Sequence, residues 1–255
     1  MKRVLSIAGS DSCGGAGIQA DLKTCAALGV DAATVVTAVT AQNTHGVRSI
    51  QRMSAAMVRA QMDAVFDGMS IDAVKLGMLA SEQIVATVAA QLTRRRPAFV
   101  VLDPVLIATS GRRLLETRAL RLMRQRLLPL SDCLTPNLAE AAALLGTPCA
   151  RNEAEMIAQG HALLALGPAA VVMKGGHAAL AEAVDLLITA DDTHRFAAPW
   201  LSVKDLHGTG CILSAGIAAN VAKGYLLADA VHRAKTHLRE LLGSRRQAEG
   251  VSASD

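Results

Sequence analysis

The chain of 255 residues has few aromatic side chains, 2% of the total, with one Trp and one Tyr. Proteins that bind single-stranded nucleic acid stack bases on such side chains, so no nucleic-acid partner is expected despite a formal net charge of +4. The arginine runs at 94–96, 112–113 and 118–126 are interpreted as solvated helix ends that weakly attract anionic ligands.

Cysteine is present but forms no paired pattern. Cys13, Cys25, Cys133, Cys149 and Cys211 are odd in number and include no C-x-x-C spacing. This argues against a zinc site or a disulfide scaffold and predicts a reducing compartment. Any important cysteine must therefore act singly.

Long apolar runs are absent as well. The run at 4–9 is too short for the apolar core of a secretory signal, and no run approaches a membrane span. We therefore expect a cytoplasmic protein with no membrane partner. With 51% hydrophobic and 19% charged residues, the chain has the composition of a globular protein. At this length about three quarters of the unfolded surface can be buried, so neither metals nor disulfides are needed for folding.

Short apolar runs alternate with stretches of helical period, which predicts an α/β fold with a mainly parallel central sheet and helices on both faces. Strands are predicted at 4–8, 34–40, 73–76, 99–102, 133–134 and 170–173. Helices are predicted at 16–28, 55–67, 81–93, 116–127, 137–145, 153–166, 211–223 and 227–242. Residues 183–188 and 194–197 predict an antiparallel edge hairpin. We expect one domain over residues 1–242 and a polar, disordered tail over 243–255.

Polar or glycine-rich residues follow each predicted strand. In open parallel sheets, ligands bind outside the carboxyl ends of the strands, so these residues should meet at one edge. They include the loop 9–17, Gln42, Asp103, Glu140 and Lys174. A hydrogen-bonding amide, two acids and a lysine at successive strand ends predict an active site there.

The loop 9–17 has three interpretations. Gly15-x-Gly17-x-x-Ala20 matches the start of a dinucleotide fingerprint. The acid expected about 20 residues later is missing, because Gln42 follows the second strand, so a nicotinamide-dependent dehydrogenase is disfavoured. The glycines otherwise either permit a tight strand-to-helix crossing or let the backbone approach a substrate.

No Walker sequence G-x-x-x-x-G-K-[ST] is present, so a P-loop is not expected and phosphate must be bound elsewhere. Gly208, Thr209 and Gly210 precede an apolar helix, where free N–H groups and the helix dipole favour an anion. The alternative is a simple N-cap at Thr209. Cys211, in the first turn, should have a lowered thiol pKa and would act as general base in phosphoryl transfer. Its alternative role is that of a small buried apolar residue.

Further charged residues suit a polyphosphate substrate. Asp103 and Glu140 offer hard oxygen ligands for Mg²⁺, and Asn137 lies one helical turn before Glu140. Lys174 ends an apolar strand, which predicts a cation directed at phosphates. Each has a simpler alternative: Asp103 ends a strand, Glu140 stabilises the first turn of a helix, and Lys174 extends to solvent.

Seven sequence motifs occur in order along most of the chain. They are GSD at 9–11 with GGAGIQADLKT at 14–24, TAQNT at 40–44, KLGM at 75–78, DPV at 103–105 with ATSG at 108–111, LTPNL-x-E at 134–140, KGGH at 174–177 and HGTGC at 207–211. Together they resemble the hydroxymethylpyrimidine/phosphomethylpyrimidine kinases of thiamine synthesis, within the ribokinase-like superfamily. The resemblance covers about residues 4–219, and Cys211, where the wider superfamily usually has aspartate, points to the pyrimidine branch.

The resemblance implies a ribokinase-like domain, usually dimeric, that uses ATP and Mg²⁺, with a monovalent cation such as K⁺ as a further candidate. The implied substrates are 4-amino-5-hydroxymethyl-2-methylpyrimidine and its monophosphate. Gln42 would hold the aminopyrimidine edge, since an amide supplies both a donor and an acceptor. The other implied pocket residues are Gly9, Asp21, Met78 and Val105.

The remaining roles follow from the same resemblance. Asp103 and Glu140 would serve magnesium, and Lys174 and Asn137 the nucleotide. The transferred phosphoryl group and the substrate hydroxyl would be handled by Gly208, Thr209, Gly210 and Cys211.

Some positions depart from the family pattern, and two other functions remain open. The family usually has a proline in the stretch occupied by Ser12 and Cys13, and His45 and Leu206 are also atypical. Pyridoxal kinases share much of this layout and are the alternative enzyme. A pyrimidine-binding module without catalysis is the alternative from another class, although a binder needs neither an activated thiol nor metal-binding acids.

Overall fold

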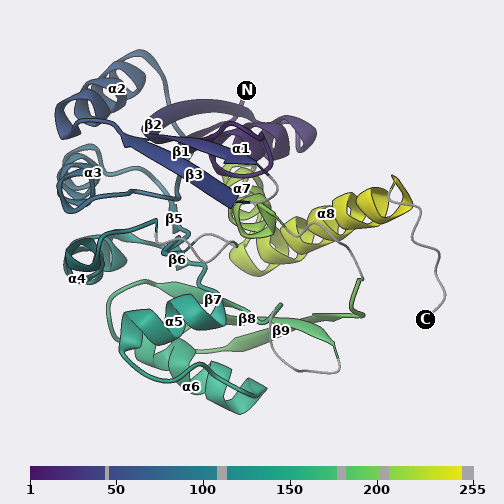
Figure 1. Ribbon diagram of the computed structural model, residues 1–255. Helices are drawn as coiled ribbons and strands as arrows, with labels where there is room; N and C mark the ends of the chain where they lie inside the picture. Colours follow the sequence, from purple (N-terminus) through teal and green to yellow (C-terminus); the bar gives the residue numbers. More distant parts are fainter. Residues whose placement is uncertain (44–45, 108–113, 177–181, 202–206, 249–255) are drawn as a thin grey trace.

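The computed structural model describes residues 1–43, 46–107, 114–176, 182–201 and 207–248. Within these ranges, nine strands form one sheet in the order β3-β2-β1-β4-β5-β6-β7-β8-β9 (Figure 1). Neighbours from β2 to β7 are parallel, whereas β3 at one edge and β8 and β9 at the other are antiparallel. The strands are β1 Arg3–Asp11, β2 Asp31–Asn43, β3 Gly46–Arg52, β4 Ala73–Leu76, β5 Val100–Leu102, β6 Cys133–Leu134, β7 Ala170–Lys174, β8 Ala183–Ile188 and β9 Thr193–Ala198.

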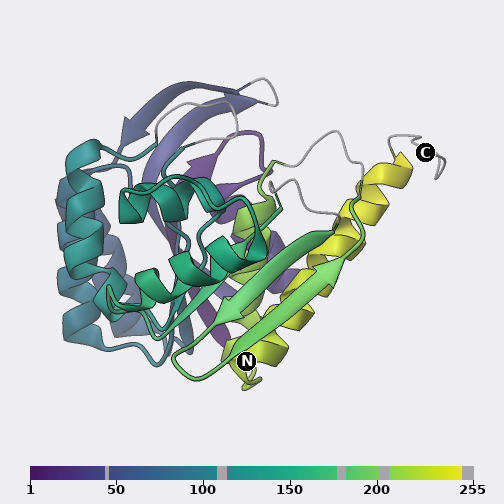
Figure 2. The same ribbon diagram turned by 90° about the horizontal axis from the view of Figure 1, so that it is seen from below.

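Helices cover both faces of the sheet. The helices are α1 Gly17–Ala27, α2 Ala55–Gly68, α3 Glu82–Arg95, α4 Thr117–Arg126, α5 Leu138–Leu145, α6 Glu153–Leu164, α7 Thr209–Ala222 and α8 Leu227–Ala248, with the short 3₁₀ helix η1 at Leu128–Leu130. Helices α2 to α6 contribute to one hydrophobic core, and α1, α7 and α8 contribute to the other. Figure 2 shows α8 running along the β8–β9 hairpin.

Alternating side chains connect the sheet to the two cores. On β1, Val4 packs in the core with α1, α7 and α8, and its neighbour Leu5 packs in the core with α2 to α6. On β7, Val172 packs in the core with α1, α7 and α8, and Met173 packs in the core with α2 to α6. Successive side chains of a strand point to opposite faces, so a strand covered on both sides must be apolar throughout. This is why the predicted strands appear as short unbroken apolar runs.

The predicted fold class, a mainly parallel sheet between two helical layers with an antiparallel edge hairpin, is confirmed. Strand β3 was not predicted, because most of its residues are partly or fully exposed and its sequence lacks an apolar run. Its pairing with β2, from Ala38 opposite Arg52 to Asn43 opposite Gly46, holds it in the sheet. The end of α8 was predicted wrongly: the helix continues past Leu242 to Ala248, so the tail expected from residue 243 is helical over its first six residues.

Within the described ranges, no helix has the length and apolarity needed to cross a bilayer. His45, Leu206, the ATSG motif at 108–111 and His177 lie outside the described residues.

Candidate active site

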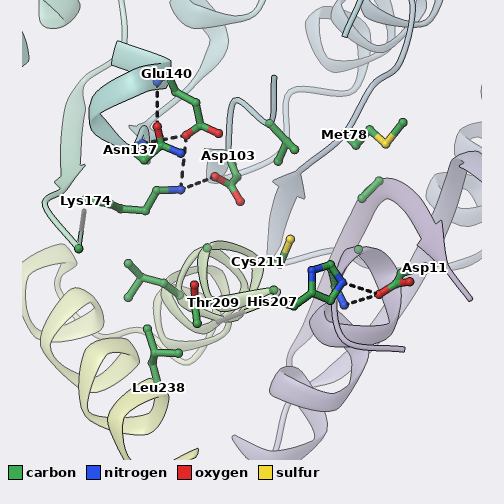
Figure 3. A pocket seen from close by; sticks show the side chains of 18 of the residues that line it. Asp11, Met78, Asp103, Asn137, Glu140, Lys174, His207, Thr209, Cys211 and Leu238 are labelled. Carbon is green, nitrogen blue, oxygen red and sulfur yellow. Dashed lines mark hydrogen bonds and ion pairs between the residues drawn. The ribbon is translucent and has the colours of Figure 1, made fainter. Parts of the chain in front are cut away.

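A cavity of about 350 Å³ lies at the carboxyl ends of the parallel strands, where the sequence predicted an active site. The strand-end residues Gly9, Gln42, Asp103 and Lys174 line it together with Glu140. Figure 3 shows the charged residues among them, Asp103, Glu140 and Lys174, facing the start of α7. The predicted convergence of strand-end residues on one edge is therefore confirmed.

The start of α7 forms one wall of the cavity. Gly208 adopts a left-handed conformation with φ of 78°, and a Cβ there would collide with the backbone oxygen of Gly15, so only glycine fits. Thr209, Gly210 and Cys211 follow in the first turn and line the cavity. The first N–H groups of a helix have no intrahelical acceptor and lie at the positive end of the dipole, so this turn suits an anion.

The thiol of Cys211 lies on the same turn, partly exposed. Burial raises its pKa to about 11, and the carboxylates of Asp21 and Asp103 act in the same direction. Lys75 and a hydrogen bond from the backbone N–H of Gly17 oppose this rise only in part. The prediction that the helix dipole lowers the pKa of this thiol is therefore wrong, because desolvation outweighs the dipole.

Lys174 links the two predicted magnesium ligands. Its Nζ atom is 2.8 Å from Oδ1 of Asp103 and 3.7 Å from Oε2 of Glu140. Gly210 lies against this group, since a Cβ there would be 3.2 Å from Nζ of Lys174. Ser214 of α7 donates to Oδ2 of Asp103 at 3.2 Å. The predicted phosphate-binding turn, cation and acids thus form one cluster.

The two acids differ in electrostatics. Burial alone would raise the pKa of Asp103, but Lys174 and Lys75 outweigh it and hold that pKa below its usual range. Burial raises the pKa of Glu140 to about 7, because Lys174 compensates only partly and Asp103 adds a second negative charge. At neutral pH, Asp103 is therefore ionised, whereas Glu140 is partly protonated.

Asn137 and Glu140 hold each other at the start of α5. The backbone N–H of Asn137 donates to Oε2 of Glu140 at 2.8 Å, and the backbone N–H of Glu140 donates to Oδ1 of Asn137 at 2.8 Å. This reciprocal pair is a capping box. Asn137 also lines the cavity, and Oδ1 is the amide atom that the capping box uses.

The donor set fits magnesium in its usual partly hydrated form. Asp103 and Glu140 present hard carboxylate oxygens on either side of one cation, the ammonium of Lys174. Among the described residues, no group of three or more His, Cys, Asp or Glu side chains forms a metal cage. Mg²⁺ commonly uses one or two carboxylates, water and substrate phosphates, which is the set this wall can offer.

Three polar side chains form the opposite end of the cavity. Nε2 of His207 is 2.8 Å from Nε2 of Gln42 and 3.0 Å from Oδ2 of Asp11. Burial alone would raise the pKa of Asp11, but hydrogen bonds from His207 and from the backbone N–H groups of Cys13 and Ala16 lower it. Gly9, Met78 and Val105 also line the cavity, as predicted.

Asp21 does not line the cavity, contrary to the prediction from the family resemblance. Both of its carboxylate oxygens are 2.9 Å from Nζ of Lys75, and the hydroxyl of Ser6 donates to Oδ2. The side chains of Asp21 and Lys75 are 1% and 0% exposed. Burial alone would lower the pKa of Lys75, but Asp21 keeps it above its usual range. Asp21 is therefore half of a buried ion pair.

Some lining residues were not predicted from the sequence. Nζ of Lys235 on α8 is 2.9 Å from Oδ2 of Asp185 and 3.0 Å from the backbone oxygen of Ala183. Trp200 and Leu238 also line the cavity. Two signals were available, namely the single Trp and a lysine on the apolar side of an amphipathic helix, but neither indicates a cavity without the fold. His207 was noted only as part of the HGTGC motif.

The chain is similar to known kinases over most of its length. A family model described as phosphomethylpyrimidine kinase matches residues 11–252. The hydroxymethylpyrimidine/phosphomethylpyrimidine kinase of Salmonella typhimurium is 50% identical over 244 residues, which cover 95% of this chain and 92% of that protein. The crystal structure of phosphomethylpyrimidine kinase from Clostridium difficile matches with a TM-score of 0.84 and 38% identity, covering 94% of this chain and 99% of that one.

A second solved structure extends the comparison to another substrate class. The ADP complex of Bacillus subtilis pyridoxal kinase matches with a TM-score of 0.87 and 34% identity, covering 92% of this chain and 90% of that one. Its fold agrees with the ribokinase-like layout expected from the motifs. The family model and the identity of the curated relative together show that this chain belongs to the phosphomethylpyrimidine kinase family.

Proposed function

We propose that this protein phosphorylates 4-amino-5-hydroxymethyl-2-methylpyrimidine and then its monophosphate, using ATP, in the synthesis of thiamine diphosphate. The observation that carries the proposal is the position of Cys211. It lies on the first turn of α7, between His207 and Asp11 on one side and the charged cluster at Lys174 on the other (Figure 3), and His207 in turn contacts Gln42. An acceptor hydroxyl and a phosphoryl donor would meet at this turn.

The cavity divides into two ends that match two substrates. Gln42 with the apolar side chains of Met78 and Val105 suits a small, flat heterocycle that has a hydrogen-bonding edge. Lys174 and the turn that starts at Gly208 suit phosphate groups. The relatives named as kinases of hydroxymethylpyrimidine and its phosphate support this assignment of the two ends.

In the first step, the hydroxymethyl oxygen attacks the γ-phosphorus, the bond to the bridging oxygen breaks, and ADP leaves. The N–H groups of the first turn of α7 and the ammonium of Lys174 stabilise the transferred group and the leaving phosphate. The substrate hydroxyl gives its proton to the thiolate form of Cys211, which becomes the thiol; because the pKa is about 11, the thiolate is the minor form at neutral pH. In the second step the acceptor is already a phosphate anion, so the thiol has little proton transfer to assist.

We propose Asp103 and Glu140 as the residues that hold Mg²⁺. When bound, Mg²⁺ screens the charge of the polyphosphate and polarises the transferred group. Asp103 is already ionised, and Glu140 binds a cation once it loses its proton. A monovalent cation such as K⁺, implied by the family resemblance, is tested by comparing activity in potassium and tetramethylammonium chloride.

Pyridoxal kinase activity is the second candidate, favoured by one observation. Pyridoxal kinases of Bacillus subtilis and Staphylococcus aureus match this fold with TM-scores of 0.87 and 0.88. Their sequence identities are 34% and 26%, below the 50% of the hydroxymethylpyrimidine/phosphomethylpyrimidine kinase from Salmonella typhimurium. The pyrimidine substrates are therefore the preferred assignment.

The test is a product assay by mass spectrometry with ATP, Mg²⁺ and each vitamin precursor in parallel. We expect pyrimidine mono- and diphosphate. Phosphorylation of pyridoxal, with no phosphorylation of the pyrimidine, would show that the protein is a pyridoxal kinase. Binding of the pyrimidine without any product would indicate a catalytically silent module.

We also propose that residues 1–242 act as one kinase domain and that the protein is a cytoplasmic homodimer. The family resemblance supports the dimer, and sedimentation equilibrium tests it. All five cysteines are free thiols, which agrees with a reducing compartment.

A further inference from the structure

His207 connects three parts of the cavity that are distant in sequence. Its Nε2 atom contacts Oδ2 of Asp11, at the end of β1, and Nε2 of Gln42, on β2, at 3.0 and 2.8 Å. It also directly precedes Gly208, where the anion-binding turn begins. The family resemblance assigns a substrate contact to Gln42 and none to His207.

Asp11 acts only as an acceptor in this cluster. Its two carboxylate oxygens accept hydrogen bonds from the backbone N–H groups of Cys13, Gly15 and Ala16, at 2.9, 3.0 and 2.8 Å. A carboxylate with three such donors remains ionised and has no proton to give. The imidazole nitrogen that faces it is therefore most stable when that nitrogen carries a proton.

An imidazole ring nitrogen either carries a proton and donates a hydrogen bond, or has a lone pair in the ring plane and accepts one. With the proton on Nε2, the single N–H of His207 is shared between Asp11 and an amide oxygen of Gln42 as a bifurcated hydrogen bond, and no two lone pairs face each other. With a lone pair on Nε2, His207 can accept from the amide NH₂, but the carboxylate of Asp11 then faces a lone pair. The first arrangement has the lower energy because it pairs every group.

The amide of Gln42 is nearly symmetric in shape, so hydrogen bonds decide which of its ends is oxygen. The second amide atom lies 3.4 Å from the hydroxyl of Thr40, whose proton is donated to the backbone oxygen of Ser10 at 3.0 Å, so this hydroxyl faces the amide as an acceptor. Thr40 therefore favours the NH₂ group, weakly at 3.4 Å, and a protonated Nε2 at 2.8 Å favours oxygen on its own side, so the two contacts select the same orientation. The selected orientation leaves one oxygen lone pair and one N–H for a ligand, in a fixed order.

We propose that His207 is a positioning residue that holds the Gln42 amide in one orientation. The amide then presents its donor and its acceptor to the substrate in a fixed order, and this order determines which pyrimidine edge it can bind. This inference rests on the proposed function, in which Gln42 faces the amino edge of the pyrimidine. A 4-aminopyrimidine offers a donor beside an acceptor, and its 4-oxo analogue offers the reverse order. Wild-type protein should therefore discriminate strongly between the two, because mismatched polar groups would face each other in the wrong complex.

The test compares kcat/KM for 4-amino-5-hydroxymethyl-2-methylpyrimidine and its 4-oxo analogue in wild type, His207→Leu and His207→Gln. In His207→Leu, the kcat/KM of the amino compound divided by that of the oxo compound should fall about tenfold, mainly because KM for the amino compound rises. A tenfold change corresponds to the loss of one hydrogen bond of about 1.4 kcal/mol. His207→Gln keeps an N–H donor at a similar reach and should restore the ratio to within about threefold. The KM for ATP should not change.

The control is His161→Leu, the same change at an exposed position on α6. A general structural defect in His207→Leu would lower activity on both compounds equally and leave their ratio unchanged, which would overturn the inference. Failure of His207→Gln to restore a lost ratio would also overturn it. Calorimetric binding of both compounds separates the two proposals: preferential binding of the amino compound without product refutes the kinase assignment alone, and binding of neither refutes both.

Discussion

Replacing Cys211 with alanine should separate the two phosphorylation steps. The first step requires removal of a proton from a neutral hydroxyl, whereas the second uses a phosphate anion as acceptor. General-base assistance contributes about 10²–10⁴-fold to such steps. We therefore expect Cys211→Ala to lower kcat of the first step by about 10²-fold or more and kcat of the second step by less than about fivefold.

The environment of Cys211 also predicts how this difference changes with pH. Its pKa is about 11, because burial and two nearby carboxylates outweigh Lys75. The thiolate is then about 10⁻⁴ of the protein at pH 7 and about 10⁻² at pH 9. For the first step, the ratio of wild-type to Cys211→Ala kcat/KM should rise about tenfold per pH unit in this range, since this quantity reports groups of the free enzyme.

The assay measures each step separately, with the hydroxymethyl compound or its monophosphate as the starting substrate and ADP release as the signal. Cys149→Ala, an exposed cysteine outside the cavity lining, is the control for loss of a thiol. Equal losses in both steps, or a ratio that does not vary with pH, would refute the base assignment and leave Cys211 with a role in packing.

Three further changes test the charged groups. Lys75→Met leaves Asp21 buried without its partner and should destabilise the fold by about 3–5 kcal/mol, lowering Tm by roughly 6–20 °C in thermal unfolding; an unchanged Tm would contradict the buried pair. Folding raises the pKa of Glu140 from 4.5 to about 7, so the folded state binds a proton more tightly than the unfolded state. This adds to the free energy of unfolding below pH 4.5, and the contribution should be lost as pH rises through 7. Urea unfolding between pH 4 and 8 should show this decline in wild type and a smaller one in Glu140→Gln; equal declines would be inconsistent with the raised pKa. Lys174→Gln should lower kcat/KM for ATP about 10²-fold without changing the KM for the pyrimidine, and steady-state kinetics with each substrate varied would disprove this if both parameters changed together.

Much of the active site could be predicted from the sequence because of where it lies in the fold. Parallel strands covered on both faces must be apolar, and the residues that follow them must meet at one edge. This placed Gln42, Asp103 and Lys174 around one cavity. The Asn137-x-x-Glu140 spacing likewise corresponds to a capping box, because both of its hydrogen bonds lie within four residues of the chain.

Interactions between distant segments could not be predicted in this way. Strand β3 is held by backbone pairing with β2 and has no apolar pattern of its own. Asp21 has the same local sequence whether it faces a ligand or Lys75, and only the fold shows that it is paired and buried. The amphipathic pattern of α8 indicated a helix, but it did not determine where that helix ends.

The sequence by itself determined the order of the elements, the edge at which they form a site and the family to which the motifs point, because these depend on local periodicity and residue type. The tertiary structure decided the protonation of Cys211, the partner of Asp21 and the contact between His207 and Gln42. A pKa depends on burial and on charges brought close by folding, and an amide takes its orientation from neighbours that are here 165 residues away in the chain. Neither quantity can be derived from a local stretch of sequence.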